Sequence, residues 1–141
     1  MSQPDPLAPM VALLAAYNRQ DWAYFRAALT DDLVVADHRS APALYDGIAD
    51  PDEFVAALLP LFEMASEVSV QTVGSYVVGP RSGVFRLSTT GLTAEGSEFE
   101  LAFHLGYVLD ADRVSRFEFF GDDQLDAACT RLRSIVERGE A

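Results

Sequence analysis

The sequence predicts an α+β domain in which helices pack on one face of a strongly curved antiparallel sheet. Apolar residues recur at helical spacing in the N-terminal part of the chain and again near its C-terminal end. Between Val68 and Phe120 the apolar period becomes twofold, and three short turn-like segments divide this region. The 141 residues contain no repeat, linker or low-complexity tract, so we expect a single domain over residues 1–141.

The N-terminal elements are predicted from apolar spacing and capping residues. Leu7–Arg19 places apolar side chains on one helical face, and Asp21 is suited to cap a second, shorter helix. The acidic pair Asp31 and Asp32 is expected to end that helix. Leu33–His38, with β-branched residues at its centre, is then expected to form the first strand.

A loop and a third helix are predicted next. Ser40–Gly47 contains a proline and a glycine and is interpreted as a loop that carries Tyr45. Asp50–Glu53 combines a capping aspartate, a proline at the first helical position and an acid three residues after the cap, which is typical of a helix start. Pro60 lacks a backbone N–H and is expected to kink or end this helix.

The C-terminal half predicts four antiparallel strands and a last helix. The strands are expected at Val68–Val78, Gly83–Thr93, Ser97–Leu109 and Arg113–Phe120. The last helix begins near Asp122 and carries a continuous apolar stripe. Both faces of the third of these strands look covered at its middle, one beneath the helices and the other against a second subunit. We therefore expect a homodimer formed through the convex face of the sheet.

Composition and charge argue against several classes of function. The net charge is −12 and all ten basic residues are arginines, so the surface repels nucleic acid. Without lysine the chain has neither a Schiff-base nucleophile nor a P-loop lysine. The two histidines are far apart and no metal-ligand spacing occurs, so we expect no dedicated transition-metal site. We also expect no cofactor.

We expect a cytoplasmic protein that does not bind membranes. Its longest apolar runs are well short of the ~20 residues that cross a bilayer. The first residues lack the basic and apolar regions of a signal peptide. The single cysteine, Cys129, cannot form an internal disulfide, which suits a reducing compartment, and its helical position indicates a small buried side chain.

The order of the predicted elements carries a family resemblance. A helix, a short helix ending in Asp-Asp, a strand ending in Asp, a helix and four long strands closely resemble the NTF2-like superfamily, in its SnoaL-like branch. The resemblance covers about Leu7 to Phe120, with the last helix added. It implies a conical α+β barrel with a deep apolar pocket.

Two enzymes of that superfamily imply site residues. In the resemblance to ketosteroid isomerase, Asp37 matches the general base and His104 the acid that donates a hydrogen bond to the substrate oxygen. Leu13 stands where that enzyme has a tyrosine. In the resemblance to scytalone dehydratase, Tyr17 matches one catalytic tyrosine, and His38 matches a second if a one-residue gap is allowed; without the gap that tyrosine falls on Asp37.

The residues themselves allow a structural as well as a catalytic interpretation. Asp37 ends an apolar strand, where burial would raise its pKa toward that of a useful base, or it caps a turn. His104, between Ala102 and Gly106, is either a hydrogen-bonded core residue or a pocket-lining donor to a developing enolate. His38 is either a second proton-transfer group or a surface residue at the strand's exit.

The remaining candidate residues are aromatic or apolar. Tyr17 either polarises a carbonyl through its hydroxyl or only packs in the core. We expect the pocket wall to contain Trp22, Tyr45, Phe54, Leu58, Phe85, Leu87, Phe117 and Phe119. Arg86 and Glu118 lie on the strand faces opposite these wall residues and are expected to form an ion pair with each other.

The leading hypothesis is a cofactor-free enzyme acting on a small apolar carbonyl compound, such as a polyketide, terpenoid or steroid-like molecule. General acid/base chemistry would isomerise, dehydrate or cyclise it. The alternative is a non-catalytic module that binds a small molecule or dimerises, favoured because residues 68–93 contain no counterpart to the dehydratase's histidine pair. Epoxide hydrolysis is a third possibility and would require an Asp-Arg-Asp cluster.

Overall fold

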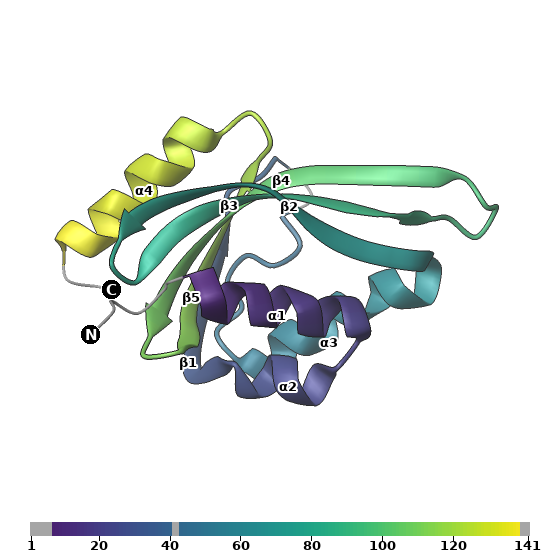
Figure 1. The fold of residues 1–141 in the computed structure, drawn as a ribbon, viewed down its shortest axis with the longest axis horizontal. Helices are drawn as coiled ribbons and strands as arrows, with labels where there is room; N and C mark the ends of the chain where they lie inside the picture. Colours follow the sequence, from purple (N-terminus) through teal and green to yellow (C-terminus); the bar gives the residue numbers. More distant parts are fainter. Residues whose placement is uncertain (1–6, 41–42, 139–141) are drawn as a thin grey trace.

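The computed structural model describes residues 7–40 and 43–138 (Figure 1). The elements are α1 (Leu7–Arg19), α2 (Trp22–Ala27), β1 (Leu29–Asp37), α3 (Pro51–Met64), β2 (Ser66–Gly79), β3 (Ser82–Leu92), β4 (Glu98–Asp110), β5 (Arg113–Gly121) and α4 (Leu125–Glu137). The predicted α+β class and order of elements are confirmed. The residues before Leu7, where a signal peptide was not expected, and the loop proline Pro42 lie outside the described residues. Within the described ranges, no helix is both long and apolar enough to cross a membrane.

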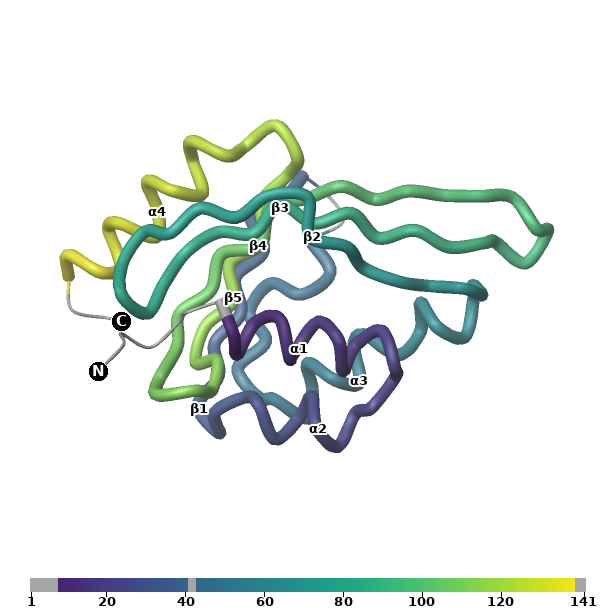
Figure 2. The backbone as a smooth tube through the Cα atoms, viewed as in Figure 1, coloured from purple at the N-terminus to yellow at the C-terminus, as the bar shows by residue number. Residues whose placement is uncertain are grey.

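The five strands form one strongly curved sheet in the order β1-β5-β4-β3-β2 (Figure 2). Strands β2 to β5 pair antiparallel with their sequence neighbours, as predicted. β1 instead pairs parallel with β5, so the sheet is mixed and not wholly antiparallel. This direction is possible because α3 and three strands separate β1 from β5, and no hairpin joins the two.

The helices cover both faces of the sheet. α1, α2 and α3 lie on the concave face, whereas α4 lies on the convex face (Figure 1). The prediction that all helices share one face is therefore wrong. Apolar periodicity shows that α4 has a buried stripe but does not show which layer that stripe meets. The smaller core beneath α4 contains Val84, Val108, Phe120, Ala128, Leu132 and Ile135.

The two covered faces of β4 are explained within one chain. Leu105 and Tyr107 point into the larger core beneath α1–α3, while Val108 belongs to the core beneath α4. Gly106 lets α4 approach closely, because a Cβ placed there would lie 2.5 Å from Leu132 Cδ2. The burial that suggested a second subunit thus comes from the chain's own last helix, and a homodimer remains a prediction.

Two predicted boundaries change in the first strand. β1 begins at Leu29, so Asp31 and Asp32 lie inside the strand and do not end the preceding helix. The pairing with β5 is irregular between Leu29 and Val34, and this irregularity leaves both carboxylates exposed. α2 itself is capped as expected, because the Asp21 carboxylate accepts a hydrogen bond from Tyr24 N–H at 3.2 Å.

α3 shows that packing outweighs a missing hydrogen bond. The Asp50 cap is confirmed, but the helix continues through Pro60 to Met64 instead of ending there. Leu61 lines the cavity described below, and Phe62 contacts the ring of Tyr17. These contacts of residues beyond the proline hold the last turn in place despite the lost N–H.

Candidate functional site

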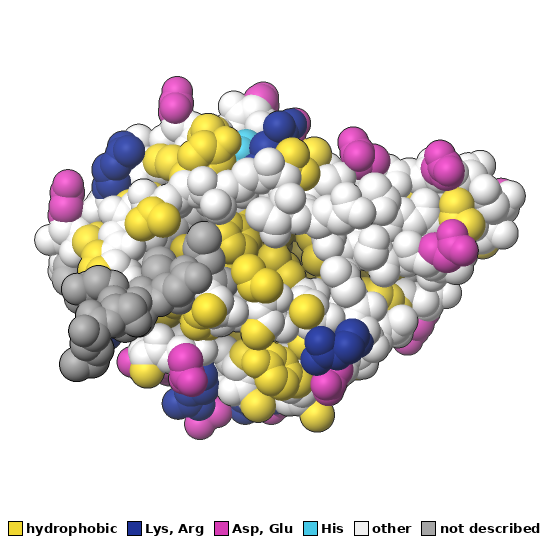
Figure 3. Space-filling view, in the orientation of Figure 1, with side chains coloured by type: hydrophobic (Ala, Val, Ile, Leu, Met, Phe, Trp, Pro, Cys, Tyr) yellow, Lys and Arg dark blue, Asp and Glu magenta, His cyan; other side chains and the backbone are white. Residues whose placement is uncertain are grey.

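A cavity of about 110 Å³ lies between the concave face of the sheet and helices α1–α3. In Figure 3 hydrophobic side chains gather between α1 and the strands above it. The polar lining residues are Tyr17, Arg39, Tyr45 and Thr89. Every other lining residue is hydrophobic, so the cavity suits an apolar ligand with few polar groups.

Most of the expected wall residues reach this cavity. Those that line it are Tyr45, Phe54, Leu58, Leu87, Phe117 and Phe119. Two expected residues do not. Trp22 packs against the rings of Tyr17 and Phe62 outside the lining, and Phe85 is buried against Tyr107. Their contribution is to the core.

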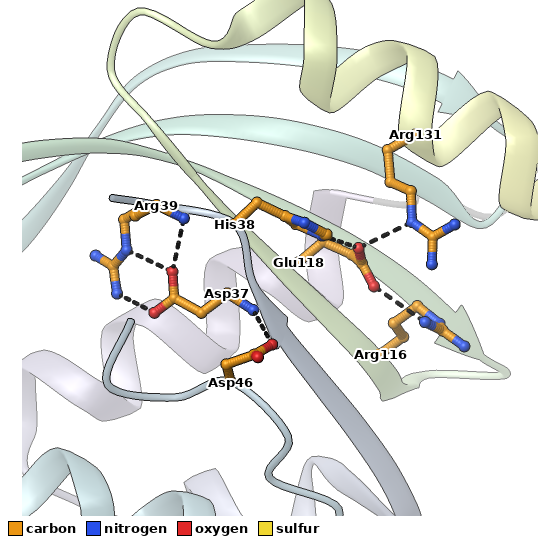
Figure 4. A network of polar contacts seen from close by, with 7 residues as sticks. All are labelled: Asp37, His38, Arg39, Asp46, Arg116, Glu118 and Arg131. Carbon is orange, nitrogen blue, oxygen red and sulfur yellow. Dashed lines mark hydrogen bonds and ion pairs between the residues drawn. The ribbon is translucent and has the colours of Figure 1, made fainter. Parts of the chain in front are cut away.

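Asp37 is held by Arg39 at the point where β1 leaves the sheet (Figure 4). Its side chain is completely buried, and Arg39 donates from Nε to Oδ1 at 2.9 Å and from Nη2 to Oδ2 at 2.7 Å. The backbone N–H groups of Arg39 and Tyr45 donate to the same two oxygens at 3.2 and 3.4 Å. Each carboxylate oxygen therefore receives two hydrogen bonds, which uses its accepting capacity.

These contacts reverse the expected pKa shift of Asp37. Burial alone would raise the pKa, but the hydrogen bonds and positive charge of Arg39 outweigh it and hold the pKa of Asp37 below its usual value. In this arrangement Asp37 is a saturated, ionised partner of Arg39, not a poised base. To accept a proton from a substrate, it would first have to lose Arg39.

Arg39 is the site residue that the sequence prediction missed. It lines the cavity, and its guanidinium lies 4.9 Å from the ring centre of Phe119, 5.5 Å from that of Phe103 and 5.6 Å from that of Tyr45. Three aromatic faces thus surround the cation, which stabilises it away from water. Strand alternation offered a signal, because Asp37 and Arg39 are two residues apart and share a face.

The phenols of Tyr17 and Tyr45 complete the polar lining. Burial raises the pKa of Tyr17 above its ordinary value, and the neighbouring phenol of Tyr45 raises it further. Burial also raises the pKa of Tyr45. Both hydroxyls therefore remain protonated at neutral pH and can donate hydrogen bonds to a ligand.

Neither histidine faces the cavity, which corrects the expectation that a carboxylate and an imidazole share one pocket. Phe103 and Leu105 of β4 line the cavity, so His104, which lies between them, points to the convex face. It is buried there, with Nδ1 3.0 Å from the Gly121 carbonyl oxygen. Since a carbonyl only accepts, Nδ1 carries the proton.

His38 also lies on the convex side, although Asp37 and Arg39, its neighbours in sequence, lie on the concave side. Its Nε2 is 2.6 Å from Glu118 Oε1, and its ring stacks on Phe120 with the ring centres 4.5 Å apart (Figure 4). Glu118 therefore pairs with His38 and with two arginines rather than with Arg86. Arg86 is instead bound to Asp122, at 2.8 and 3.2 Å. Across residues 7–40 and 43–138, no three His, Cys, Asp or Glu side chains gather as metal ligands would.

Comparisons with known proteins identify the architecture. No family model and no curated protein matches the sequence. Among solved structures, an NTF2-like protein from Burkholderia thailandensis aligns with a TM-score of 0.69 and 21% identity, over 90% of this chain and 98% of that one. The chain has the NTF2-like fold.

Two further NTF2-like neighbours have informative names. The Δ5-3-ketosteroid isomerase of a Mycobacterium species aligns with a TM-score of 0.66 and 15% identity, over 83% of this chain and 95% of that one. A Mycobacterium tuberculosis protein in complex with estradiol-17β-hemisuccinate aligns with a TM-score of 0.70 and 15% identity, over 86% and 98%. At these identities the likeness establishes the NTF2-like fold, and the chemistry has to come from the cavity itself.

Proposed function

We propose that this NTF2-like chain binds a small, uncharged hydrophobic molecule in the cavity, through an oxygen atom that accepts hydrogen bonds. The observation that carries this proposal is the Asp37–Arg39 pair, with Arg39 at the cavity wall and Asp37 behind it. A cavity that offers the remaining guanidinium nitrogen of Arg39 and two neutral phenols on an apolar wall suits an apolar carbonyl compound.

Charge balance favours a neutral ligand. Asp37 and Arg39 cancel one another, so a carboxylate ligand would leave one unbalanced negative charge in a largely apolar cavity. An ammonium ligand would face the guanidinium of Arg39 and find no free carboxylate among the described lining residues. A ketone, aldehyde or ester meets neither penalty.

The hydrogen-bonding groups favour an acceptor. Arg39 can only donate, and the phenols of Tyr17 and Tyr45 stay protonated. Two of the Arg39 nitrogens are occupied by Asp37, which leaves Nη1 to meet a ligand oxygen. The same groups support the carbonyl class expected from the sequence.

The cavity volume limits the ligand to about one ring in this conformation. An apolar protein cavity of about 150 Å³ holds benzene, and the cavity here measures about 110 Å³. A steroid-sized molecule would require α1 or the 43–47 segment to move outward. A one-ring ketone is therefore the sensible first probe.

Acid/base catalysis in the same cavity is the second candidate function. Asp37 lies on the concave side of the sheet, and its carboxylate would become a base if a ligand drew Arg39 away. Tyr17 would then donate to the carbonyl oxygen. His38 and His104 no longer enter this mechanism, since both lie on the convex face. Epoxide hydrolysis has less support, because Asp46 bonds to the Asp37 backbone N–H and not to Arg39.

A matched set of one-ring compounds tests binding. Acetophenone, benzoate and benzylamine share a ring and differ in charge, so their binding to the full chain by calorimetry separates the classes. We expect acetophenone to bind at least tenfold more tightly than the other two. Tighter binding of benzoate or benzylamine would contradict the proposal.

Two tryptophan variants locate the binding, and an assay separates binding from catalysis. Leu101→Trp narrows the cavity, whereas the exposed Val73→Trp on β2 lies outside the lining and serves as the control.

Product formation by NMR then tests turnover. Conversion that Asp37→Asn slows by about 10²–10⁴-fold would support catalysis, and binding without conversion would support the binding module.

We also propose that the chain belongs to the SnoaL-like branch, that it forms a homodimer and that it lies in the cytoplasm. The convex face outside α4 is the surface on which a second copy would be expected. Sedimentation of the full chain tests the dimer directly.

A further inference from the structure

A second polar cluster, separate from the cavity, surrounds Glu118 on the convex face beside α4 (Figure 4). The Glu118 side chain is completely buried. It accepts hydrogen bonds from His38 Nε2 at 2.6 Å, from Arg116 Nη1 at 3.0 Å and from Arg131 Nε at 3.1 Å. Arg116 belongs to β5 and Arg131 to α4, so two guanidinium groups from different elements converge on one carboxylate.

The charges of this cluster do not cancel. Two arginines contribute +2 and Glu118 contributes −1, which leaves +1 even with His38 neutral. Burial alone would raise the pKa of Glu118, but its three donors outweigh burial and keep the pKa below its usual value, so the carboxylate is ionised. The rest of this protein, whose net charge is −12, is screened beyond about 8 Å at physiological ionic strength. Close to the cluster, the excess positive charge therefore decides what binds.

The attachment of α4 to the sheet explains the position of Arg131 but not that of Arg116. Arg131 joins the helix to the sheet. Arg116 stands two residues before Glu118 on the same strand and the same face, so its bond to Glu118 links no second element. It adds a second guanidinium beside the first.

Among residues 7–40 and 43–138, Glu118 is the carboxylate that both arginines bind. On β1, Val34 pairs with Arg116 and Ala36 pairs with Glu118. On α4, the positions one turn from Arg131 are apolar or small: Ala127, Ala128, Ser134 and Ile135. Within the described part of the chain, each arginine uses a single nitrogen on Glu118, and their side chains are 19% and 33% exposed. Both keep N–H groups for an outside acceptor.

We propose that Arg116 and Arg131 bind a phosphate-type oxyanion on the convex face, with Glu118 as the residue that positions both. Planar guanidinium forks match the oxygens of a phosphate group and bind it with charge-assisted hydrogen bonds. The buried Glu118 restrains both forks before the ligand arrives, which lowers the entropy lost on binding. His38, 38% exposed at its side chain, borders the same site. The ligand is either free inorganic phosphate or the phosphate group of a small monoester.

The test is a titration of the full chain with inorganic phosphate and with glycerol 3-phosphate, at fixed pH and with sodium chloride holding the ionic strength constant. Amide NMR shifts report the affinity and the place of binding. We expect shifts at Arg116, Arg131 and their neighbours. Tighter binding of the ester identifies a monoester site, and equal or weaker binding identifies a site for the free ion. A response no larger than that of chloride to either compound would overturn the proposal.

Matched arginine variants make the test specific. Arg116→Gln and Arg131→Gln are each expected to weaken phosphate binding at least tenfold. Arg86→Gln is the control, because Arg86 lies on the same sheet face but is neutralised one-to-one by Asp122. Equal loss in Arg86→Gln and Arg116→Gln would show a nonspecific charge effect and refute the site. If Arg131→Gln does not fold, Arg116→Gln still decides, since its side chain joins no second element.

Discussion

Arg39 binds both carboxylate oxygens of Asp37 from only two residues further along the chain, at 2.9 and 2.7 Å. One member of this pair lines the cavity and the other lies wholly buried behind it. The aspartate that sequence resemblance marks as a base is therefore the anchor of the cavity's cation. This relationship changes what substitution of either residue should do.

Asp37→Asn is expected to destabilise the fold. Removing one partner of a buried ion pair leaves the other charge without compensation, at a cost of about 3 kcal/mol at the lower end of the usual range. The lower end of the range applies because the Arg39 side chain is 25% exposed to solvent. Urea unfolding measures the change. A double-mutant cycle with Arg39→Gln should show strong coupling, whereas unchanged stability in Asp37→Asn would show that the pair does not stabilise the fold.

The stability of the protein should fall as pH drops through the acidic range. Asp37 and Glu118 both have a pKa below the ordinary value, so the unfolded chain binds protons more readily than the folded one. Each group therefore stabilises the fold fully above the pKa of the unfolded chain, about 4. The stability is lost as pH falls through the lower pKa of the folded state.

Urea midpoints between pH 7 and pH 3 check this expectation. The midpoint should be nearly flat down to about pH 5 and then decrease. In Asp37→Asn the decrease should be smaller, because one of the two groups no longer titrates. An equal decrease in the variant and the wild type would show that Asp37 does not contribute to the loss of stability at low pH.

Glu118→Gln is expected to loosen α4 from the sheet. The neutral amide leaves Arg116 and Arg131 without a counter-charge in a largely buried place, and Arg131 is the polar link from α4 to β5. Hydrogen exchange of the α4 amides should therefore accelerate more than that of α1. Asp122→Asn provides the comparison. It breaks an exposed pair with Arg86, which solvent screens, and should change the exchange of the α4 amides much less.

The sequence predicted the fold well where local signals are strong. The twofold period from Val68 onward gave four strands within a few residues, and Asp50 with Pro51 gave the start of α3. The side of the sheet that α4 covers was not predictable, since an apolar stripe does not specify the layer it meets. The parallel direction of β1 is likewise a property of the tertiary arrangement and not of Leu33–His38 itself.

The site was predicted only in part, for a reason found in one tripeptide. Asp37, His38 and Arg39 alternate in direction, so the two outer residues lie on the concave side of the sheet and the histidine lies on the side of α4. The family resemblance implied catalytic roles for Asp37 and His38 but none for Arg39. His104 was misplaced for the same reason, because its neighbours Phe103 and Leu105 already occupied the cavity side.

Gly106→Ala tests the close packing of α4 on the sheet. The new methyl carbon would lie 2.5 Å from Leu132 Cδ2 and 3.3 Å from Leu132 Cγ, and Leu132 is itself fully buried. Relieving this overlap requires the helix or the leucine to shift, at a cost of about 1–3 kcal/mol. Chemical denaturation of the single variant measures the loss. The double variant Gly106→Ala/Leu132→Val removes Leu132 Cδ2, the atom of closest approach, so its loss of stability should be smaller than the sum of the losses in the two single variants. Strict additivity would mean that Gly106 is small for a reason other than the approach of α4.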